Sequence, residues 1–157
     1  MTIITLTYLD ILLRLGAAVL FGGLVGIERV MAHKKAGVRT YALVSLGSAL
    51  FIITAQLVTS MYYGLIDVDP TRIASNIVMG IGFLGGGLII LNGGKHLRGV
   101  TTAAGLWIAA GIGMAVGFGF FGLGFISAIL TIFIFTGLWY FELLIKKISP
   151  PANERDN

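Results

Sequence analysis

The chain has 157 residues, of which 57% are hydrophobic and only 11% charged, and its formal net charge is +4. Its mean hydropathy is +0.96, and a soluble domain of this length has too little interior to bury so much apolar surface. The composition excludes a soluble globular protein, the absence of cysteine excludes disulfides and thiolate chemistry, and the confinement of basic residues to short segments between apolar runs argues against a nucleic-acid partner.

Five apolar segments follow one another, each near the roughly 17–25 residues that a membrane-spanning helix requires. We expect an all-α bundle of five transmembrane helices at about 8–27, 40–62, 72–91, 101–117 and 121–145. The first is interpreted as a retained helix, because neither a basic start nor a small-residue cleavage pattern marks it as a signal peptide. Residues 1–148 then form one domain in the lipid bilayer, and residues 149–157 form a short polar tail.

Basic residues gather in alternate connections. Nine of the 11 lie between the first and second helices, between the third and fourth, or after the fifth. Five crossings place all three segments on one side, which the positive-inside rule assigns to the cytoplasm. We therefore predict an N-terminus outside and a C-terminus in the cytoplasm. Four crossings would separate the basic tail from the basic first connection.

The first helix carries three ionisable groups in or beside its apolar run. Helical spacing places Asp10 and Arg14 one turn apart, which favours an interfacial ion pair. Glu28 lies at the inner end beside Arg29. Because charges in membrane helices face the bundle interior or a pathway, Glu28 is the stronger functional candidate.

Glycine pairs spaced by four residues recur in three helices and let helix backbones approach closely. These helix-packing candidates are Gly22, Gly26, Gly82, Gly86, Gly113 and Gly117. They fit either a homo-oligomer interface or packing within one chain. The run Gly85–Gly87 similarly fits either a tight crossing or a broken helix at a site.

The connection before the third helix contains two carboxylates. Asp69 suits a helix N-cap and Pro70 the first helical position. The alternative is that Asp67 and Asp69 weakly attract hydrated Mg²⁺, which prefers carboxylate ligands. Arg72 and Asn76 lie one turn apart on one helix face, so both could look into the bundle.

The connection before the fourth helix is basic. Thr101 or Thr102 as a cap, near Lys95 and Arg98, could hold an anion or a lipid headgroup, although ordinary topology explains the same charges. Trp107 lies mid-helix, where its indole N–H should bond across a helix interface. No nucleophile motif and no metal-ligand spacing accompany these residues, which predicts a protein that is not an enzyme and has no cofactor, with Mg²⁺ as a possible ion.

Several ordered motifs resemble those of the MgtC/SapB family of bacterial inner-membrane proteins. They read GGLVGIER at 22–29, AGVRT at 36–40, DPTRIA at 69–74, GIGFLGGG at 80–87 and RGVTTAAGLW at 98–107. The resemblance covers about residues 16–117. It implies a link to growth in low magnesium and, in the virulence members, survival in macrophages and restraint of the F-type ATP synthase. The residues most typical of the family are, by position, Glu28, Arg29, Arg39, Thr40, Arg72, Thr101, Thr102 and Trp107.

The virulence members carry a soluble domain after the membrane part, whereas this chain stops at Asn157, so we expect the membrane core alone. The leading hypothesis is a protein of magnesium homeostasis that associates with itself as a homo-oligomer or with a membrane partner. The alternative is an oligomeric Mg²⁺ channel or transporter lined by polar groups. Convergence of Glu28, Arg39 and Thr101 on a wet cavity would favour transport, and a dry bundle would favour association.

Overall fold

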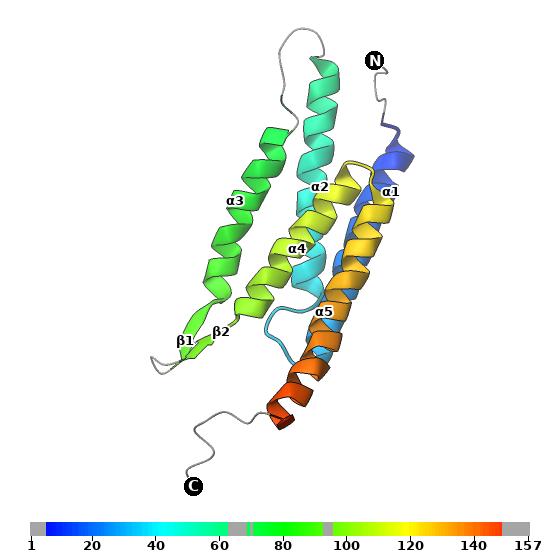
Figure 1. Cartoon of the computed structure of the whole chain (residues 1–157). Helices are drawn as coiled ribbons and strands as arrows, with labels where there is room; N and C mark the ends of the chain where they lie inside the picture. The colour runs from blue at the N-terminus through cyan, green and yellow to red at the C-terminus, as the bar shows by residue number, and fades with distance from the viewer. Residues whose placement is uncertain (1–5, 63–68, 70, 93–95, 149–157) are drawn as a thin grey trace.

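The computed structural model describes residues 6–62, 69, 71–92 and 96–148. Its helices are α1 (Tyr8–Met31), α2 (Val38–Met61), α3 (Thr71–Leu88), α4 (Val100–Gly117) and α5 (Phe121–Ile148), and its short strands are β1 (Ile90–Asn92) and β2 (His96–Arg98). The helices alternate in direction, so that α1 begins where α2 ends and α5 finishes at the opposite end of the bundle (Figure 1). The expected five-helix bundle is confirmed.

Four of the five helices, α1, α2, α4 and α5, are long and apolar enough to cross a membrane. The helix α3 carries Arg72 and Asn76 in its first two turns. It nevertheless runs alongside α2 and α4 over much of their length (Figure 1). The fold therefore contains four apolar spans, with α3 as a fifth helix beside them.

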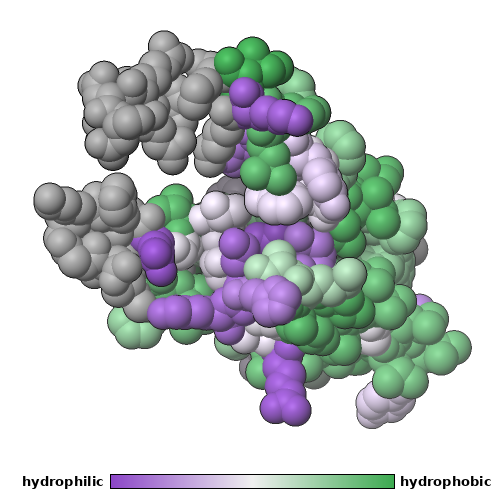
Figure 2. Space-filling view, turned by 90° about the horizontal axis from the view of Figure 1, so that it is seen from below, coloured by the Kyte–Doolittle hydropathy of each residue, from purple (hydrophilic) through white to green (hydrophobic). Residues whose placement is uncertain are grey.

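Charge is distributed unevenly between the two ends of the bundle. We call the end where α1 and α5 finish the basic end, because most of the described basic side chains lie there. They are Arg29, Lys34, Lys35, Arg39, Arg98 and Lys147. Seen from this end, hydrophilic groups gather over the face of the molecule and hydrophobic groups cover much of its flank (Figure 2). This arrangement matches a bundle whose sides face hydrocarbon and whose end faces water.

The helix α1 begins at a capping box. The Thr7 hydroxyl accepts a hydrogen bond from the Asp10 backbone, and the Asp10 carboxylate accepts one from the Thr7 backbone. The helix ends at Met31, and His33 follows with a φ of 54°, in the left-handed region. The tight exit returns the chain to α2 beside the end of α1.

The third helix differs from its predicted end. It was expected to run to Leu91, but it stops at Leu88, and an antiparallel pair follows in which Ile90 lies opposite Arg98. Gly85–Gly87 remain helical. The reason for the stop is the combination of three weak helix formers with the β-branched residues that follow them. Gly99, which links β2 to α4, has a φ of 95°, and any side chain there would overlap the carbonyl of Leu88.

The helix α4 is the centre of the bundle and packs against the other four helices. Half of its apolar window is buried, against 17% for that of α5. Glycine makes this possible: a methyl group on Gly113 would overlap the backbone of Ser45 in α2. A methyl on Gly117 would lie 3.0 Å from the Ala49 backbone. The core therefore rests on close helix crossings rather than on large side chains.

Candidate functional site

A buried guanidinium lies at the basic end of α1. Arg29 is 2% exposed although it is charged. Its side chain forms an ion pair with the neighbouring Glu28 carboxylate, and its guanidinium carbon lies 3.4 Å from the centre of the Phe135 ring of α5. Thr136 donates a long hydrogen bond of 3.5 Å to the other oxygen of Glu28. The pair is thus held from α5 by both an aromatic face and a hydroxyl.

This ion pair lines an open groove of about 1100 Å³ between the ends of α1, α4 and α5, which we call the basic-end groove. Thr101 contributes from the start of α4. His33 and Lys34 contribute from the exit of α1, and Glu142 from α5. The groove therefore holds carboxylates and cations together, and its charge is nearly balanced. Such a lining suits a polar partner segment better than a strongly charged ligand.

A buried tyrosine supports the groove from behind. Tyr41 of α2 is completely buried, and its hydroxyl donates a hydrogen bond of 3.3 Å to the carbonyl of Thr102. Gly105 leaves room for it, because a methyl there would overlap both the Tyr41 hydroxyl and the Phe135 ring. Gly105 therefore sets the position of Phe135, and through that ring the position of Arg29.

The other predicted residues are divided between the two ends. Arg39 and Thr40 are exposed on the first turn of α2 and do not line the groove. Arg72 and Asn76 are exposed on α3, toward the opposite end. Trp107 is half-exposed on α4. Of the three residues whose convergence was to distinguish transport from association, two, Glu28 and Thr101, meet in one groove.

The three glycine pairs differ in whether another helix packs against them. Gly22 and Gly26 of α1 lie against α2, at Ser45 and Val38, and Gly113 and Gly117 of α4 also lie against α2. A methyl on Gly82 or Gly86 of α3 would meet nothing within 4 Å. Two pairs therefore serve packing within the chain, and the third pair leaves an open face.

The two carboxylates considered for Mg²⁺ lie just before the start of α3 in the sequence. Asp67 lies outside the described residues. Asp69 accepts hydrogen bonds from the backbone and hydroxyl of Thr71, at 2.8 and 2.6 Å, as a helix cap does. These bonds hold the pKa of Asp69 below its ordinary value. They occupy one carboxylate oxygen of Asp69 with capping.

Asp10 and Arg14 have separate partners, and no ion pair joins these two described residues. The Arg14 guanidinium donates to the side chain of Gln56 at 2.9 Å and to the backbone carbonyl of Gly117 at 2.8 Å. The Asp10 carboxylate caps α1 instead. The expected pair is replaced because the end of α4 offers a free carbonyl, which favours a cation.

A family model described as the MgtC family matches residues 15–143 of this chain. The chain belongs to the MgtC family. Protein MgtC of Brucella abortus (strain 2308) is 48% identical over 93 residues, which cover 59% of this chain and 36% of that protein. The protein named "Putative magnesium transporter YhiD" of Escherichia coli (strain K12) is 38% identical over 133 residues, or 80% of this chain and 59% of the relative.

Protein SapB of Bacillus subtilis (strain 168) is 34% identical over 145 residues, which cover 90% of this chain and 60% of SapB. The MgtC-family chain described here thus spans between 36% and 60% of the length of these three relatives. No solved structure matches it. Its apolar helices and its relatives identify a multi-pass bacterial membrane protein.

The resemblance seen in the motifs is confirmed, and the fold shows how three of them meet in this MgtC-family chain. The motif at 22–29 supplies the Glu28–Arg29 pair and the motif at 98–107 supplies Thr101 and Gly105. The motif at 36–40 supplies the turn that packs on Gly26. Tyr41 and Phe135 were not singled out as site residues, because nothing in an aromatic residue of an apolar helix distinguishes it from a lipid-facing one.

Proposed function

We propose that this chain crosses the bacterial inner membrane five times, with its basic end in the cytoplasm, and serves magnesium homeostasis as a self-associating protein that is not an enzyme. The magnesium link is supported by the family and by the name of the Escherichia coli relative. The topology is supported by the gathering of basic side chains at one end.

The observation that favours self-association over ion transport is the pairing of Glu28. Its carboxylate is paired with the buried Arg29, which cancels the field that would attract a divalent cation. Beyond the pair, the space between α1, α2 and α4 is filled by side chains such as Val25, Leu106 and Ala109, all at most 1% exposed. Mg²⁺ gives up its waters reluctantly, so this packed interior is an unfavourable path for it.

The surface proposed for association is the open face of α3 at Gly82 and Gly86. Small residues four apart allow a second helix to approach closely, and within this chain both positions are unopposed. We expect the Gly82 and Gly86 face of a second copy to lie against it. Van der Waals contact between the two backbones would then supply the stabilisation.

Cross-linking in native membranes tests this face, and the chain offers a clean background because it has no cysteine. We expect Gly82→Cys and Gly86→Cys to form disulfide-linked dimers on mild oxidation. The matched control is Leu20→Cys, at an exposed position of α1, and it should remain monomeric. Equal cross-linking at Gly82 and Leu20 would contradict the proposal.

The alternative function is Mg²⁺ transport, and it is favoured by one observation: Glu28 and Thr101 line the same open groove. Magnesium entry into liposomes that contain the purified chain and a magnesium-sensitive dye separates the two. We expect entry at the rate of protein-free liposomes, both for the native chain and for Glu28→Gln. Protein-dependent entry that is abolished by Glu28→Gln would establish the transporter instead.

A further inference from the structure

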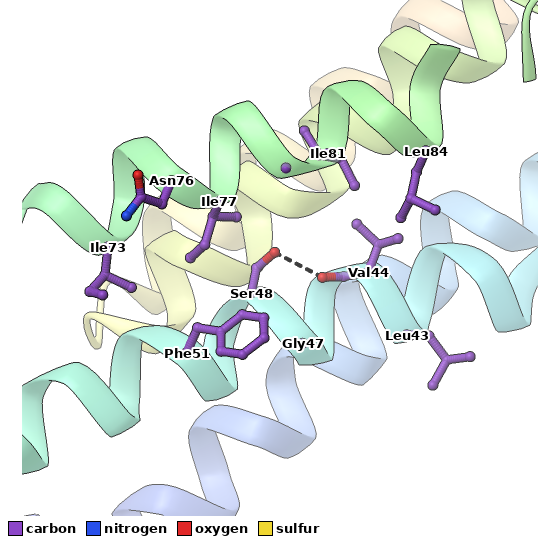
Figure 3. Close-up of a pocket in the computed structure, with 11 residues that line it drawn as sticks. Leu43, Val44, Gly47, Ser48, Phe51, Ile73, Asn76, Ile77, Ile81 and Leu84 are labelled. Atoms are coloured by element: carbon purple, nitrogen blue, oxygen red, sulfur yellow. Dashed lines mark hydrogen bonds between the residues drawn. The ribbon is translucent and has the colours of Figure 1, made fainter. Parts of the chain in front are cut away.

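A second, apolar groove separates α2 from α3. It has a volume of about 530 Å³ and is lined by residues of these two helices (Figure 3). Its walls include Leu43, Gly47 and Phe51 of α2 and Ile73, Ile77 and Leu84 of α3. We call it the α2–α3 groove. Because α2 crosses the membrane, this groove opens among hydrocarbon chains.

The dimensions of the α2–α3 groove fit a lipid chain better than a protein helix. From Ile73 to Leu84 the helix rises about 17 Å, close to one leaflet's share of a hydrocarbon core about 30 Å thick. A helix about 10 Å wide and equally long would occupy on the order of 1300 Å³. Even with the open space at its mouth counted, the groove holds about 1030 Å³ and is smaller than such a helix. A single extended acyl chain needs only a narrow space of one leaflet's length.

The polar groups of α3 lie at the groove end that is remote from the basic end. Asn76 is among the residues that line the groove there (Figure 3). The amide has no hydrogen-bond partner among the described residues. In hydrocarbon such a group is costly, so it favours a ligand with a carbonyl acceptor.

Arg72 lies four residues before Asn76 on α3, about 6 Å along the axis and on nearly the same face. It is exposed at the start of an 18-residue helix, whose amino-terminal dipole also favours an anion. Asp69 lies close enough to Arg72 for the two opposite charges to attract each other, and Thr71 occupies one of its oxygens. From water inward, the surface thus presents a cation, an amide and an apolar channel.

That order is the order of groups in a phospholipid. We propose that the α2–α3 groove binds one phospholipid from the leaflet opposite the basic end. Its phosphate lies at Arg72, an ester carbonyl accepts from the Asn76 amide, and one acyl chain fills the groove. The site does not depend on self-association, because Gly82 and Gly86 lie about 200° and 240° around α3 from Gly80 on the groove wall.

Native mass spectrometry of the full chain in detergent, titrated with a palmitoyl-oleoyl phosphatidylglycerol or phosphatidylethanolamine, tests the proposal. We expect one phospholipid to remain on the monomer. Arg72→Gln should weaken retention about tenfold, as the loss of a charge-assisted hydrogen bond does. A diacylglycerol with the same chains, which lacks the phosphate, should also bind about tenfold more weakly.

The groove itself is tested by Gly80→Phe, with Gly82→Phe as its matched control. Both glycines lie on α3 with open space at the added carbon, but only Gly80 lines the groove. We expect Gly80→Phe to abolish retention and Gly82→Phe to preserve it on the monomer. Native-like retention in Gly80→Phe, or a dimer that Gly80→Phe alone dissociates, would overturn the lipid site. Failure of Gly82→Cys to cross-link would overturn only the association face.

Discussion

Replacing Gly113 with alanine adds one methyl group at the point where α4 crosses α2. The methyl would overlap the backbone carbonyl of Ser45. Backbone cannot rotate away as a side chain can, so the two helices must separate. Separation would loosen neighbours that are now fully enclosed, among them Ile112 and Val116.

The magnitude follows from two opposing effects. Overpacking a close-packed core costs about 1–3 kcal/mol, and a backbone obstacle places this case at the upper end. Alanine is a better helix former than glycine by about 1 kcal/mol. We therefore expect Gly113→Ala to lower the free energy of unfolding by about 2 kcal/mol.

Gly111→Ala is the matched control, because the same methyl on the same helix would meet nothing within 4 Å. It should raise the free energy of unfolding by up to about 1 kcal/mol. The two variants then differ by about 3 kcal/mol, somewhat over a hundredfold in the unfolding equilibrium. Unfolding in mixed micelles with increasing sodium dodecyl sulfate, followed by circular dichroism, measures both. Equal stability of the two variants would refute the packing of α4 described above.

Three further predictions follow from other contacts. Glu28→Gln should lower the free energy of unfolding by about 3 kcal/mol, because it leaves the buried Arg29 unpaired. The double variant Glu28→Gln/Arg29→Met should lower it by less, and the same micelle titration measures both. Arg14→Leu should lower stability by about 1–3 kcal/mol in that assay, because two hydrogen bonds that tie α1 to α2 and to the end of α4 are lost. Thr71→Val should raise the pKa of Asp69, measured by carboxyl carbon-13 NMR, because the hydroxyl that stabilises the carboxylate is removed.

Each of these predictions has a result that would contradict it. A double variant that is no more stable than Glu28→Gln alone would show that the two side chains do not act as a pair. Unchanged stability in Arg14→Leu would mean that the end of α4 needs no cation. For Asp69, the sign is fixed by its lowered pKa: its contribution is present above the unfolded pKa and is lost as the pH falls through the folded one. A pKa unmoved by Thr71→Val would show that the Thr71 hydroxyl does not stabilise the carboxylate.

Hydropathy and charge predicted the five helices because each apolar run is long and the runs are separated by polar connections. The end of α3 was misplaced because Ile89 and Ile90 continue an apolar run without continuing a helix. Apolar character alone does not distinguish a helical turn from a short strand. The left-handed conformation of Gly99, between β2 and α4, gave no signal beyond the identity of the residue as glycine.

The candidate site was predictable in part. Glu28 stood out as a charge at the end of an apolar helix, but its partner depended on packing between α1 and α5. Phe135 holds Arg29 from a position more than 100 residues away. The role of Gly105 likewise emerges only where Tyr41 and Phe135 converge. Helical periodicity gives the face of one helix, whereas the site is formed by faces of several.

The central claim is that the basic end lies in the cytoplasm, and single cysteines in this cysteine-free chain test it most directly. Lys34→Cys, Lys147→Cys and Asp69→Cys are treated in intact cells with a maleimide that crosses the outer membrane but not the inner one. Asp69→Cys should react at once, and the two lysine replacements should react only after the inner membrane is permeabilised. Labelling of Lys34→Cys and Lys147→Cys from opposite sides would contradict the five-crossing topology.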